Sequence, residues 1–413
     1  MKILLSHPTG NANVRAVAEG FAEAGVLDKF YTTFATTPGR LLYRLGGVPG
    51  LSEIRRRSYS SLLSPYMKSY PLYETGRMIA GKLHIERLLG HETGLFCIDR
   101  VYHRLDNQIA AHLSKKKRQP NAVYAYEDGA LQTFREAKAC GIQTLYDLPI
   151  GYWRAAREML QSEISLRPGW AATLSGFRDS EAKLMRKDAE LSLADHIYVA
   201  SSFTAQTLKR YPGGLAPVSV IPYGFPDVRA GRIYSAPGGR KLKLLFVGGL
   251  SQRKGIANLF EAIAGLESRV ELTVVGQKAV ADCDALNRAL ACHTWIPSMP
   301  HAAILELMRT QDVLVFPSLF EGFGLVITEA MSQGTPVITT ERTIGPDIIR
   351  HGENGWLTAA GSTAELRAKI EDILTQPSQL TRVGQAAMET ARLRPWSEYG
   401  REMAASVQQI HRR

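Results

Sequence analysis

Two glutamates eight residues apart stand in the stretch PSLFEGFGLVITEAMSQGTPVIT, residues 317–339. Glu321 falls in a glycine-flanked turn, and Glu329 falls in the apolar segment that follows the turn. We expect strand, turn and helix here, with the helix beginning near Gly324. Such a helix start points free N–H groups and the positive end of its dipole into the turn. This is the outline of a diphosphate site.

The two carboxylates need a different explanation, because a carboxylate beside a bound anion is electrostatically unfavourable. Its use there is to accept hydrogen bonds from neutral hydroxyl groups, in which sugars and riboses are rich. A nucleotide-sugar fits this layout, with Glu329 on the ribose, the helix start on the phosphates and Glu321 on the sugar.

A second phosphate-type element is the stretch LLFVGGLSQRKGIANLFEAI. Gly248 and Gly249 end an apolar strand, and Arg253 and Lys254 come just before the next helix. Two cations and a helix start can together meet phosphate oxygens.

Together these motifs resemble the GT-B glycosyltransferases of family 4. The resemblance covers roughly the second half of the chain, from EAKLMRKDAELSLADHIYVASSFTAQTL through VSVIPYGFPD to IIRHGENGWL. It implies an α/β protein with two Rossmann-like domains that face a central cleft and a C-terminal helix that crosses back to the N-terminal domain. It also implies a donor nucleotide-sugar on the C-terminal domain, an acceptor on the N-terminal domain, and transfer with retention of configuration. No metal ion and no other cofactor is implied.

Carried over motif by motif, the resemblance assigns roles to single residues. Glu321 contacts the donor sugar, Lys254 neutralises the leaving diphosphate, and Glu329 contacts the ribose. The remaining donor-binding residues are the backbone positions Phe323, Gly324 and Leu325, the glycines Gly248 and Gly249, and Ile296 near the base.

The chain departs from the family pattern at the phosphate side of the cleft. Many relatives carry Arg where this chain has Gly249, and we expect Arg253 to supply that cation from another direction. The first turn, SHPTGNANV, lacks the paired glycines of relatives. Gly10 then admits the donor phosphates, and Asn11 and Asn13 are candidate acceptor contacts.

The catalytic group of the N-terminal domain stays open. Relatives often carry His at the end of a strand where this chain has Tyr146 and Asp147, and Glu127 and Asp128 end the preceding strand. A carboxylate can orient or deprotonate an acceptor hydroxyl, and we take Asp147 as the catalytic candidate. A helix-capping role is the alternative for Asp128 and Asp147. His7, at the end of the first strand, is a further acceptor-side candidate.

The elements that must position these residues are short apolar runs that alternate with amphipathic segments, a pattern typical of βα units around parallel sheets. KILLSH, AVYAYE, QTLYDLP and HIYVAS are predicted strands of one sheet, and RKLKLLFVGGL, VELTVVGQ, DVLVFPS and TPVITT are predicted strands of another. We expect a domain over 1–222, a linker over 223–240, a donor domain over 241–390 and a returning helix over 391–413. Pro395 is expected to kink the helical C-terminal region.

Charge is unevenly distributed along the 413 residues. Residues 37–118 hold 15 Lys and Arg against 6 Asp and Glu, which is +9 of the formal net charge of +11. Basic residues alternate there with Leu, Tyr and Met, a pattern that suits contact with an anionic membrane surface, and a merely solvated face is the equal alternative. Nucleic acid is not expected as a partner, because zinc spacing, helix-turn-helix and RNP-type motifs are missing.

The remaining composition indicates a globular protein with reduced cysteines, since the four cysteines form no CxxC pair. The N-terminus is expected to be a buried strand and no apolar run has the length of a membrane span, so we expect a cytoplasmic protein. Peripheral attachment to the inner face of the membrane is an alternative that the basic region leaves open.

Three other functions compete with transfer to a carbohydrate or lipid-linked acceptor. A sugar-nucleotide epimerase would release sugar without transfer. A binding protein of the same fold that lost its catalytic base would hold the nucleotide without turnover. A dinucleotide oxidoreductase is disfavoured, because GxGxxG does not follow the first strand.

Overall fold

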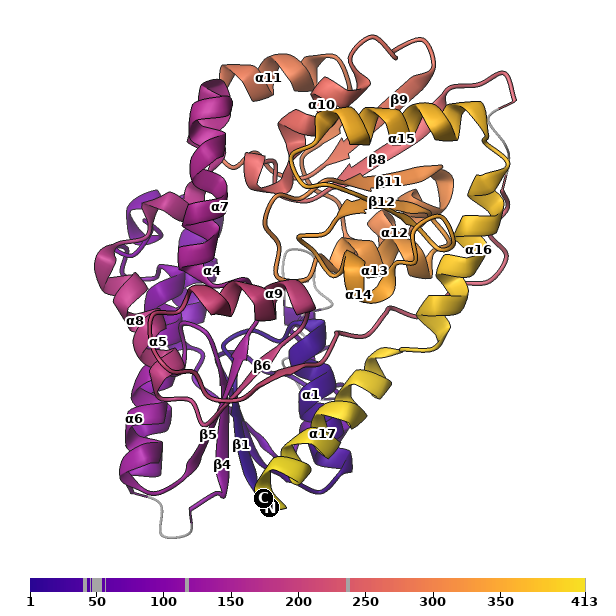
Figure 1. Cartoon of the computed structure of the whole chain (residues 1–413). Helices are drawn as coiled ribbons and strands as arrows, with labels where there is room; N and C mark the ends of the chain where they lie inside the picture. The colour runs from indigo at the N-terminus through magenta and orange to yellow at the C-terminus, as the bar shows by residue number, and fades with distance from the viewer. Residues whose placement is uncertain are drawn as a thin grey trace.

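Two parallel β-sheets, one in each half of the chain, organise the protein in the computed structural model (Figure 1). The structure describes residues 1–39, 43–44, 46, 54–55, 57–115, 119–234 and 238–412. The first sheet has the order β3 (Met67–Ser69), β2 (Leu27–Thr32), β1 (Ile3–Ser6), β4 (Ala122–Tyr126), β5 (Gln143–Leu148), β6 (His196–Val199) and β7 (Val218–Val220). The second has the order β10 (Thr294–Ile296), β9 (Val270–Val275), β8 (Leu242–Val247), β11 (Val313–Phe316), β12 (Val337–Thr340) and β13 (Trp356–Thr358). The two predicted Rossmann-like sheets are therefore confirmed.

Helices cover both sheets. Those of the first half are α1 (Ala12–Glu23), α4 (Leu72–Lys82), α5 (Ile98–Leu113), α6 (Leu131–Ala139), α7 (Trp153–Leu166), α8 (Glu181–Ser192) and α9 (Ser202–Thr207). Those of the second half are α10 (Ile256–Ile263), α11 (Asp284–Ala291), α12 (His301–Thr310), α13 (Leu325–Ser332), α14 (Gly345–Ile348), α15 (Thr363–Thr375), α16 (Gln379–Arg392) and α17 (Trp396–Arg412). Single 3₁₀ turns are η1 (Ser61–Leu63), η2 (Glu86–Leu88), η3 (Pro168–Thr173), η4 (Ser175–Arg178), η5 (Leu208–Arg210) and η6 (Gln252–Lys254).

Strand order places one crevice in each sheet. In the first sheet the order reverses between β1 and β4, and in the second it reverses between β8 and β11. Central strands buried on both faces explain why the sequence carries continuous apolar runs there. Ligands of open α/β sheets bind at such switch points, beyond the carboxyl ends of the strands.

The C-terminal helix α17 returns to the first half of the chain, as predicted (Figure 1). It packs along α1, and the two backbones approach so closely that a Cβ at Gly20 would lie 2.2 Å from the carbonyl oxygen of Gly400. The structure has a break rather than the expected kink, because α16 ends at Arg392 and α17 begins at Trp396, just after Pro395. Proline has no N–H to continue the first helix and fits the first turn of the second.

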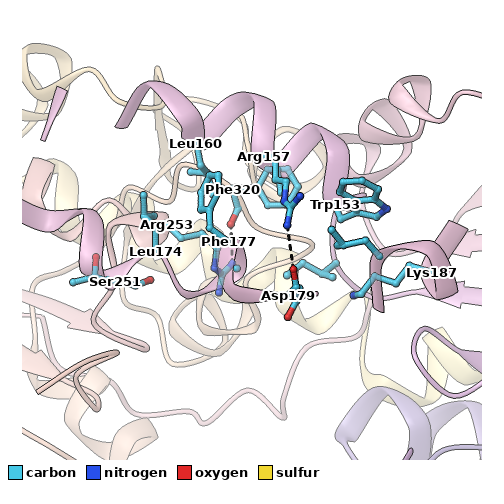
Figure 2. Close-up of a pocket in the computed structure, with 16 residues that line it drawn as sticks. Trp153, Arg157, Leu160, Leu174, Phe177, Asp179, Lys187, Ser251, Arg253 and Phe320 are labelled. Carbon is cyan, nitrogen blue, oxygen red and sulfur yellow. Dashed lines mark hydrogen bonds between the residues drawn. The ribbon is translucent and has the colours of Figure 1, made fainter. Parts of the chain in front are cut away.

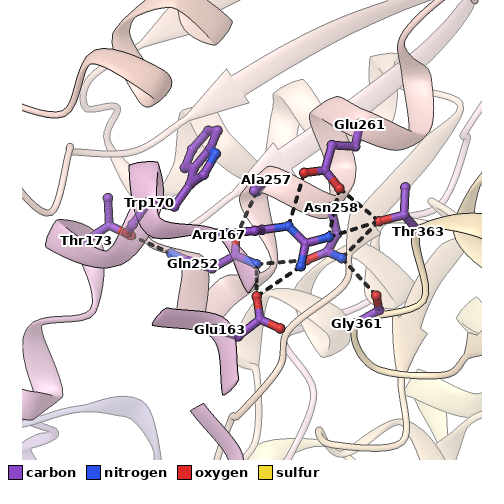
Figure 3. A network of polar contacts seen from close by, with 10 residues as sticks. All are labelled: Glu163, Arg167, Trp170, Thr173, Gln252, Ala257, Asn258, Glu261, Gly361 and Thr363. Carbon is purple, nitrogen blue, oxygen red and sulfur yellow. Dashed lines mark hydrogen bonds and ion pairs between the residues drawn. The ribbon is translucent and has the colours of Figure 1, made fainter. Parts of the chain in front are cut away.

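Helix α7 and turn η3 connect the two halves a second time, through a polar network that Figure 3 shows. Arg167 donates to both carboxylate oxygens of Glu261 on α10, at 3.0 and 2.7 Å, and pairs with Glu163 at 3.1 Å. Gln252 donates to Glu163 at 2.8 Å and to Asn258 at 2.9 Å. The segment after β5 is therefore fixed against the second sheet's helices, which the sequence did not predict.

Candidate functional site

A cavity of about 390 Å³ lies between the two halves, where the carboxyl ends of β1 and β4 face those of β8 and β11. We call it the central cleft. Its described lining residues are His7, Asn11, Asn13, Tyr102, Tyr126, Pro149, Tyr223, Val247, Gly248, Gly249, Lys254, Phe316, Glu321, Phe323, Gly324, Leu325 and Val326. Most of the predicted donor-side residues and three of the predicted acceptor-side residues therefore meet in one place.

The turn before α13 has the predicted geometry. Gly324 has φ 87°, in the left-handed region that side chains rarely adopt, and α13 begins at the next residue, Leu325. At Gly322 a Cβ would lie 2.2 Å from the carbonyl oxygen of Pro149, so the turn is pressed against the loop after β5. The hydroxyls of Ser201 and Thr204 donate to the carbonyl of Gly322 at 2.6 and 2.9 Å. The first domain thus holds the turn while the first N–H groups of α13 point into the cleft.

Glu321 sits between two cations. Its Oε2 atom contacts the Lys254 ammonium, and the same oxygen lies 3.2 Å from Nη1 of Arg253. Burial and the neighbouring Arg253 charge lower the pKa of Lys254, and burial lowers the pKa of Arg253 to about 10. One carboxylate shared by two cations leaves a positive site, which suits an anion.

Arg253 does not line the central cleft. It reaches Glu321 from behind the turn, where it also donates to the carbonyl of Phe320 at 2.8 Å, and it lines a second cavity. Lys254 instead lies over the Phe316 ring, 4.9 Å from its centre, on the cleft side. Within the cleft, Lys254 is therefore the cation that meets a bound phosphate.

Gly248 and Gly249 end β8 at the floor of the cleft. Gly248 has φ 153°, and the Gly276 backbone packs so closely that a Cβ there would lie 1.8 Å from the Gly248 carbonyl oxygen. Gly249 has open space where a Cβ would stand. The floor of the cleft is therefore backbone at these two positions.

Glu329 borders a neighbouring cavity of about 520 Å³, which Leu325 separates from the central cleft. Its Oε1 atom lies 2.9 Å from Nε2 of His301, and this contact raises the pKa of His301. The other predicted nucleoside contact, Ile296, ends the edge strand β10 and lines neither cavity.

On the first domain's side of the cleft, His7 is buried and Nδ1 accepts a hydrogen bond of 3.0 Å from the Thr9 N–H. Burial lowers its pKa to about 4, so the imidazole is neutral near pH 7. Asn11 precedes α1 as its cap residue and lines the cleft, as does Asn13, the second residue of α1. Gly10 does not line the cleft; a Cβ there would meet the hydroxyl of Tyr59 at 2.4 Å.

The acids at the strand ends do not line the cleft. Asp147 is buried below it and accepts a hydrogen bond of 2.6 Å from the Tyr124 hydroxyl, and burial raises its pKa to about 7. Glu127 pairs with Lys187 of α8 at 3.0 Å, and Asp128 lies 3.4 Å from the same ammonium. Burial raises the pKa of Glu127 against the opposing effect of Lys187.

Strand alternation explains the placement of Glu127, and it identifies residues that the sequence reasoning missed. Successive side chains of β4 point to opposite faces, so Glu127 turns toward α8 while its neighbour Tyr126 faces α1 and the cleft. Tyr126 is 2% exposed, and its hydroxyl has no hydrogen-bond partner in the described part of the chain. Its ring packs edge-on against His7, with centroids 4.7 Å apart. Tyr102 and Tyr223 complete this aromatic wall.

Among the described residues no helix has the length and apolar character that a membrane span needs. All four cysteines are free thiols.

Comparison with known proteins finds relatives of the second half of the chain and solved structures of the same fold. Residues 234–390 match the family model of group 1 glycosyl transferases. Glycogen synthase of Mycobacterium tuberculosis is 26% identical over 260 residues, covering 61% of this chain and 60% of that protein. Phosphatidyl-myo-inositol mannosyltransferase of Mycobacterium leprae is 30% identical over 160 residues, covering 37% and 43%. The chain thus spans 60% or less of the length of these relatives.

Two solved structures match the whole chain. Sucrose-phosphate synthase from Thermosynechococcus elongatus superposes with a TM-score of 0.66 at 19% identity, covering 100% of this chain and 98% of that one. The HepE protein of Anabaena in complex with UDP and glucose gives 0.62 at 16% identity, covering 99% of each. The fold is therefore GT-B, as the motifs predicted. The match to the group 1 glycosyl transferase model falls within the second half of the chain.

Proposed function

We propose that the protein is a retaining glycosyltransferase that needs no metal ion, moving a sugar from a nucleoside-diphosphate sugar to a carbohydrate or lipid-linked acceptor. The observation that carries the proposal is the meeting of Glu321, Lys254 and the start of α13 in the central cleft. A cation and a row of free N–H groups stabilise a departing diphosphate, and a carboxylate beside them binds sugar hydroxyls.

In this proposal the donor occupies the central cleft and the neighbouring cavity that Glu329 borders. Its diphosphate lies at Lys254 and the α13 N-terminus, its sugar reaches Glu321, and its ribose extends past Leu325 to Glu329. A relative of the same fold holds UDP and glucose, which supports a nucleoside-diphosphate sugar as the donor class. Lys254 contacts Glu321 in this structure, so donor binding exchanges that carboxylate for phosphate oxygens.

Transfer then breaks the bond between the sugar's anomeric carbon and the diphosphate, and forms a bond from that carbon to an acceptor oxygen. The acceptor proton needs a base. His7 is the basic side chain of the first domain among the described cleft residues, but its pKa of about 4 makes it weak. A terminal phosphate oxygen has a pKa of about 6, so the leaving diphosphate itself is the better proton acceptor. This removes the need for a carboxylate base from the first domain.

The acceptor enters from the wall formed by Asn11, Asn13, Tyr102 and Tyr126. A hydroxyl and two amides suit a polar acceptor group, and aromatic rings suit the apolar face of a sugar. One relative is named for mannosyl transfer to a phosphatidyl-myo-inositol, which supports a lipid-linked acceptor.

A surface on α4 supports a membrane-bound acceptor. Leu72, Ile79 and Leu83 are 73, 53 and 63% exposed, and their spacing of seven and four residues places them on one helix face. The basic residues Lys82 and Arg87 lie beside this face and are exposed. We call residues 72–87 the α4 surface and propose that it rests on anionic lipid at the cytoplasmic side of a membrane. Lys116, Lys117 and Arg118, also predicted to take part, lie outside the described residues.

The test is an assay of nucleoside diphosphate release with EDTA present, over a panel of UDP-, GDP- and ADP-sugars, for the native protein and Glu321→Ala. We expect slow hydrolysis of one donor class by the native protein and none by the variant. Transfer to an acceptor should preserve the anomeric configuration, which NMR of the product checks. Activity that appears only when a divalent cation is added would refute the metal-independent proposal.

A second candidate is a nucleotide-sugar-binding protein without turnover. It is favoured by one observation: no acid of the first domain lines the cleft among the described residues. It predicts saturable binding of a nucleoside diphosphate, with neither hydrolysis nor transfer for any donor.

A further inference from the structure

A second cavity, of about 190 Å³, lies behind the turn that carries Glu321 (Figure 2). Helix α7, the 3₁₀ turns η3 and η4, the start of α8 and the loop before η6 enclose it. Gly151 and Phe320 both line it and pack closely, since a Cβ at Gly151 would lie 2.4 Å from the Phe320 ring. We call it the α7 cavity. Its volume is larger than that of a cavity that holds one benzene-sized molecule, so it has room for a small ligand.

The walls of the α7 cavity are largely apolar. Leu160, Leu174, Leu184 and Phe320 are each 5% exposed or less, so the side chains around the void are shielded from bulk water. Trp153 and Phe177 add aromatic faces. Such a lining favours an apolar ligand body.

The same cavity carries an excess of positive charge. Arg157, Lys187 and Arg253 line it with one acid, Asp179. Asp179 is engaged by Lys183 at 3.2 Å and by His91 at 3.0 Å, and Lys187 is engaged by Glu127. Arg253 shares its one carboxylate with Lys254. The positive charge that remains falls on Arg157 and Arg253.

Arg157 has donor capacity that the described part of the protein does not use. Its Nη2 donates to the backbone carbonyl of Asp179 at 3.2 Å, and its Nε is buried with no hydrogen-bond partner among the described residues. A buried donor without an acceptor is costly, typically about 1–3 kcal/mol, unless a ligand satisfies it. Guanidinium groups match the paired oxygens of carboxylates and phosphates.

We propose that the α7 cavity is a second ligand site for an amphipathic anion, a molecule with an apolar body and one carboxylate or phosphate group. The apolar body fills the space between the leucines and the aromatic rings, and the anion meets Arg157 and Arg253. Binding at this site does not depend on the proposed function, whereas its effect on the donor does.

That effect follows from shared residues. Arg253 and Phe320 line the α7 cavity, and the next residues in each segment, Lys254 and Glu321, line the central cleft. An anion on Arg253 competes with Glu321 for the guanidinium, so an occupied α7 cavity changes the charge around the donor site. By linkage, the nucleotide must change the affinity of the anion by the same factor.

The experiment uses decyl phosphate and decanoate as probes, with decanol and decyltrimethylammonium as matched uncharged and cationic controls, all below micelle formation. Isothermal titration calorimetry with the full chain should show saturable binding of at least one anion and much weaker binding of both controls. Decyl phosphate and decanoate distinguish a phosphate from a carboxylate ligand. Equal binding of decanol, or no saturable binding of either anion, would overturn the proposal.

Variants locate the site. Ala156→Phe places a ring in the cavity and Arg157→Gln removes the charge, and each should weaken binding about tenfold or more. Gln161→Phe on α7 and Arg288→Gln on α11 make the same changes at exposed positions that do not line the cavity, and should bind like the native protein. Unchanged binding in both cavity variants would place the anion elsewhere and refute the assignment. Thermal unfolding checks that each variant folds, and Arg157→Gln carries the test if Ala156→Phe does not.

Nucleoside diphosphate affinity is then measured with and without the bound anion. We expect a change of about threefold or more, matched by the reciprocal change in anion affinity. If the anion binds but no nucleotide does, the proposed function fails while the ligand site stands. If donor is transferred but no anion binds, the ligand site fails alone.

Discussion

The Nη1 atom of Arg253 lies 3.2 Å from Oε2 of Glu321, and this is the same carboxylate oxygen that the Lys254 ammonium contacts. Two cations therefore approach one acid from opposite sides, Lys254 from the central cleft and Arg253 from the α7 cavity. The acid that the proposed function places on the donor sugar is held by both, so its position responds to the charge in either cavity.

We expect a substitution of Glu321 to lower product formation and a substitution of Lys254 to lower nucleoside diphosphate affinity. We expect Glu321→Gln to lower product formation about 100-fold or more while nucleoside diphosphate affinity changes little, because Glu321 acts on the sugar. Lys254→Gln should weaken nucleoside diphosphate binding about 10-fold or more, since it removes a charge-assisted hydrogen bond. Initial rates and calorimetry measure the two effects.

The control for this pair is Glu353→Gln, a change at a 67% exposed side chain of the same domain. It should leave both quantities unchanged. If Glu321→Gln weakens nucleotide binding as much as Lys254→Gln does, the carboxylate organises the phosphate site and the division of roles is wrong.

We expect substitutions of Glu329 and His301 to change nucleoside diphosphate affinity by different amounts, although the two side chains contact each other. Glu329→Ala should weaken binding of a nucleoside diphosphate about tenfold, because it removes the acceptor proposed for the ribose hydroxyls. His301→Ala should change that affinity by less than about threefold, since its side chain is 59% exposed and pairs with Glu329 in a strongly screened setting.

The contact between Glu329 and His301 should also make nucleotide affinity depend on pH. The contact with Glu329 raises the pKa of His301 above 6.5, so the protonated pair is present below that value and is lost as pH rises through the raised pKa. Glu329 must leave His301 to accept from a ribose, so the native protein should bind nucleotide more tightly above this transition than below it. The His301→Ala variant should lack the step, and a step that persists would assign it to another group.

Asp147 should influence stability more than catalysis. Its pKa rises from 3.8 to about 7 on folding, so the folded protein binds a proton that the unfolded chain has lost. Stability therefore falls as pH rises from about 4 to about 7, by up to about 4 kcal/mol for this group. Asp147→Asn keeps an oxygen for the Tyr124 hydroxyl and should be more stable than the native protein near pH 8.

Urea unfolding at several pH values measures this difference, and the comparison with the native protein cancels the contributions of other buried groups. His7 contributes with the opposite sign, since its lowered pKa makes stability fall as pH drops from about 6.5 to about 4. Activity of Asp147→Asn should fall by less than about tenfold, because Asp147 does not line the cleft. A loss near that of Glu321→Gln would restore Asp147 as a catalytic residue.

The sequence predicted the second domain more fully than the first, for a physical reason. The turn before α13 depends on local features, namely Gly324 in the left-handed region and an apolar helix that begins at Leu325, and both can be recognised from neighbouring residues. The β-strands followed in the same way from their apolar runs. The positions of Glu321, Lys254, Gly248 and their neighbours in one cleft then followed from the switch point of a parallel sheet.

On the first domain's side the sequence reasoning took acids at strand ends and did not follow side-chain alternation. Glu127 and Tyr126 are adjacent, yet Glu127 pairs with Lys187 of α8 whereas Tyr126 lines the cleft. The α7 cavity and the network around Arg167 were not foreseen at all, because both join segments that are far apart in the sequence, such as Arg167 and Glu261. No local pattern records such contacts.

Tyr126 should position the acceptor. Tyr126 lines the cleft and its buried hydroxyl has no partner among the described residues, so Tyr126→Phe should lower transfer to the acceptor about tenfold while donor hydrolysis is unchanged. Removing an unsatisfied buried hydroxyl should also leave thermal stability equal or higher. A variant that loses hydrolysis and transfer together would show that Tyr126 acts on the donor instead.

The α4 surface predicts charge-dependent membrane binding. Lys82→Gln with Arg87→Gln should weaken partition onto phosphatidylglycerol-containing vesicles about 30-fold, since each basic residue near an anionic surface contributes about 1 kcal/mol. Ile79→Ser with Leu83→Ser should weaken partition through loss of buried apolar area. Cosedimentation with anionic and with neutral vesicles measures both effects.

The apolar effect has a matched control at Leu393, a leucine of the second half that is 81% exposed. Leu393→Ser removes a similar apolar side chain away from the α4 surface and should bind vesicles like the native protein. All these positions are exposed, so the variants should unfold at the native temperature, and a lost interaction cannot be attributed to lost fold. Equal partition of the native protein onto anionic and neutral vesicles would mean that the basic residues serve solubility alone, and the acceptor would then not need a membrane surface.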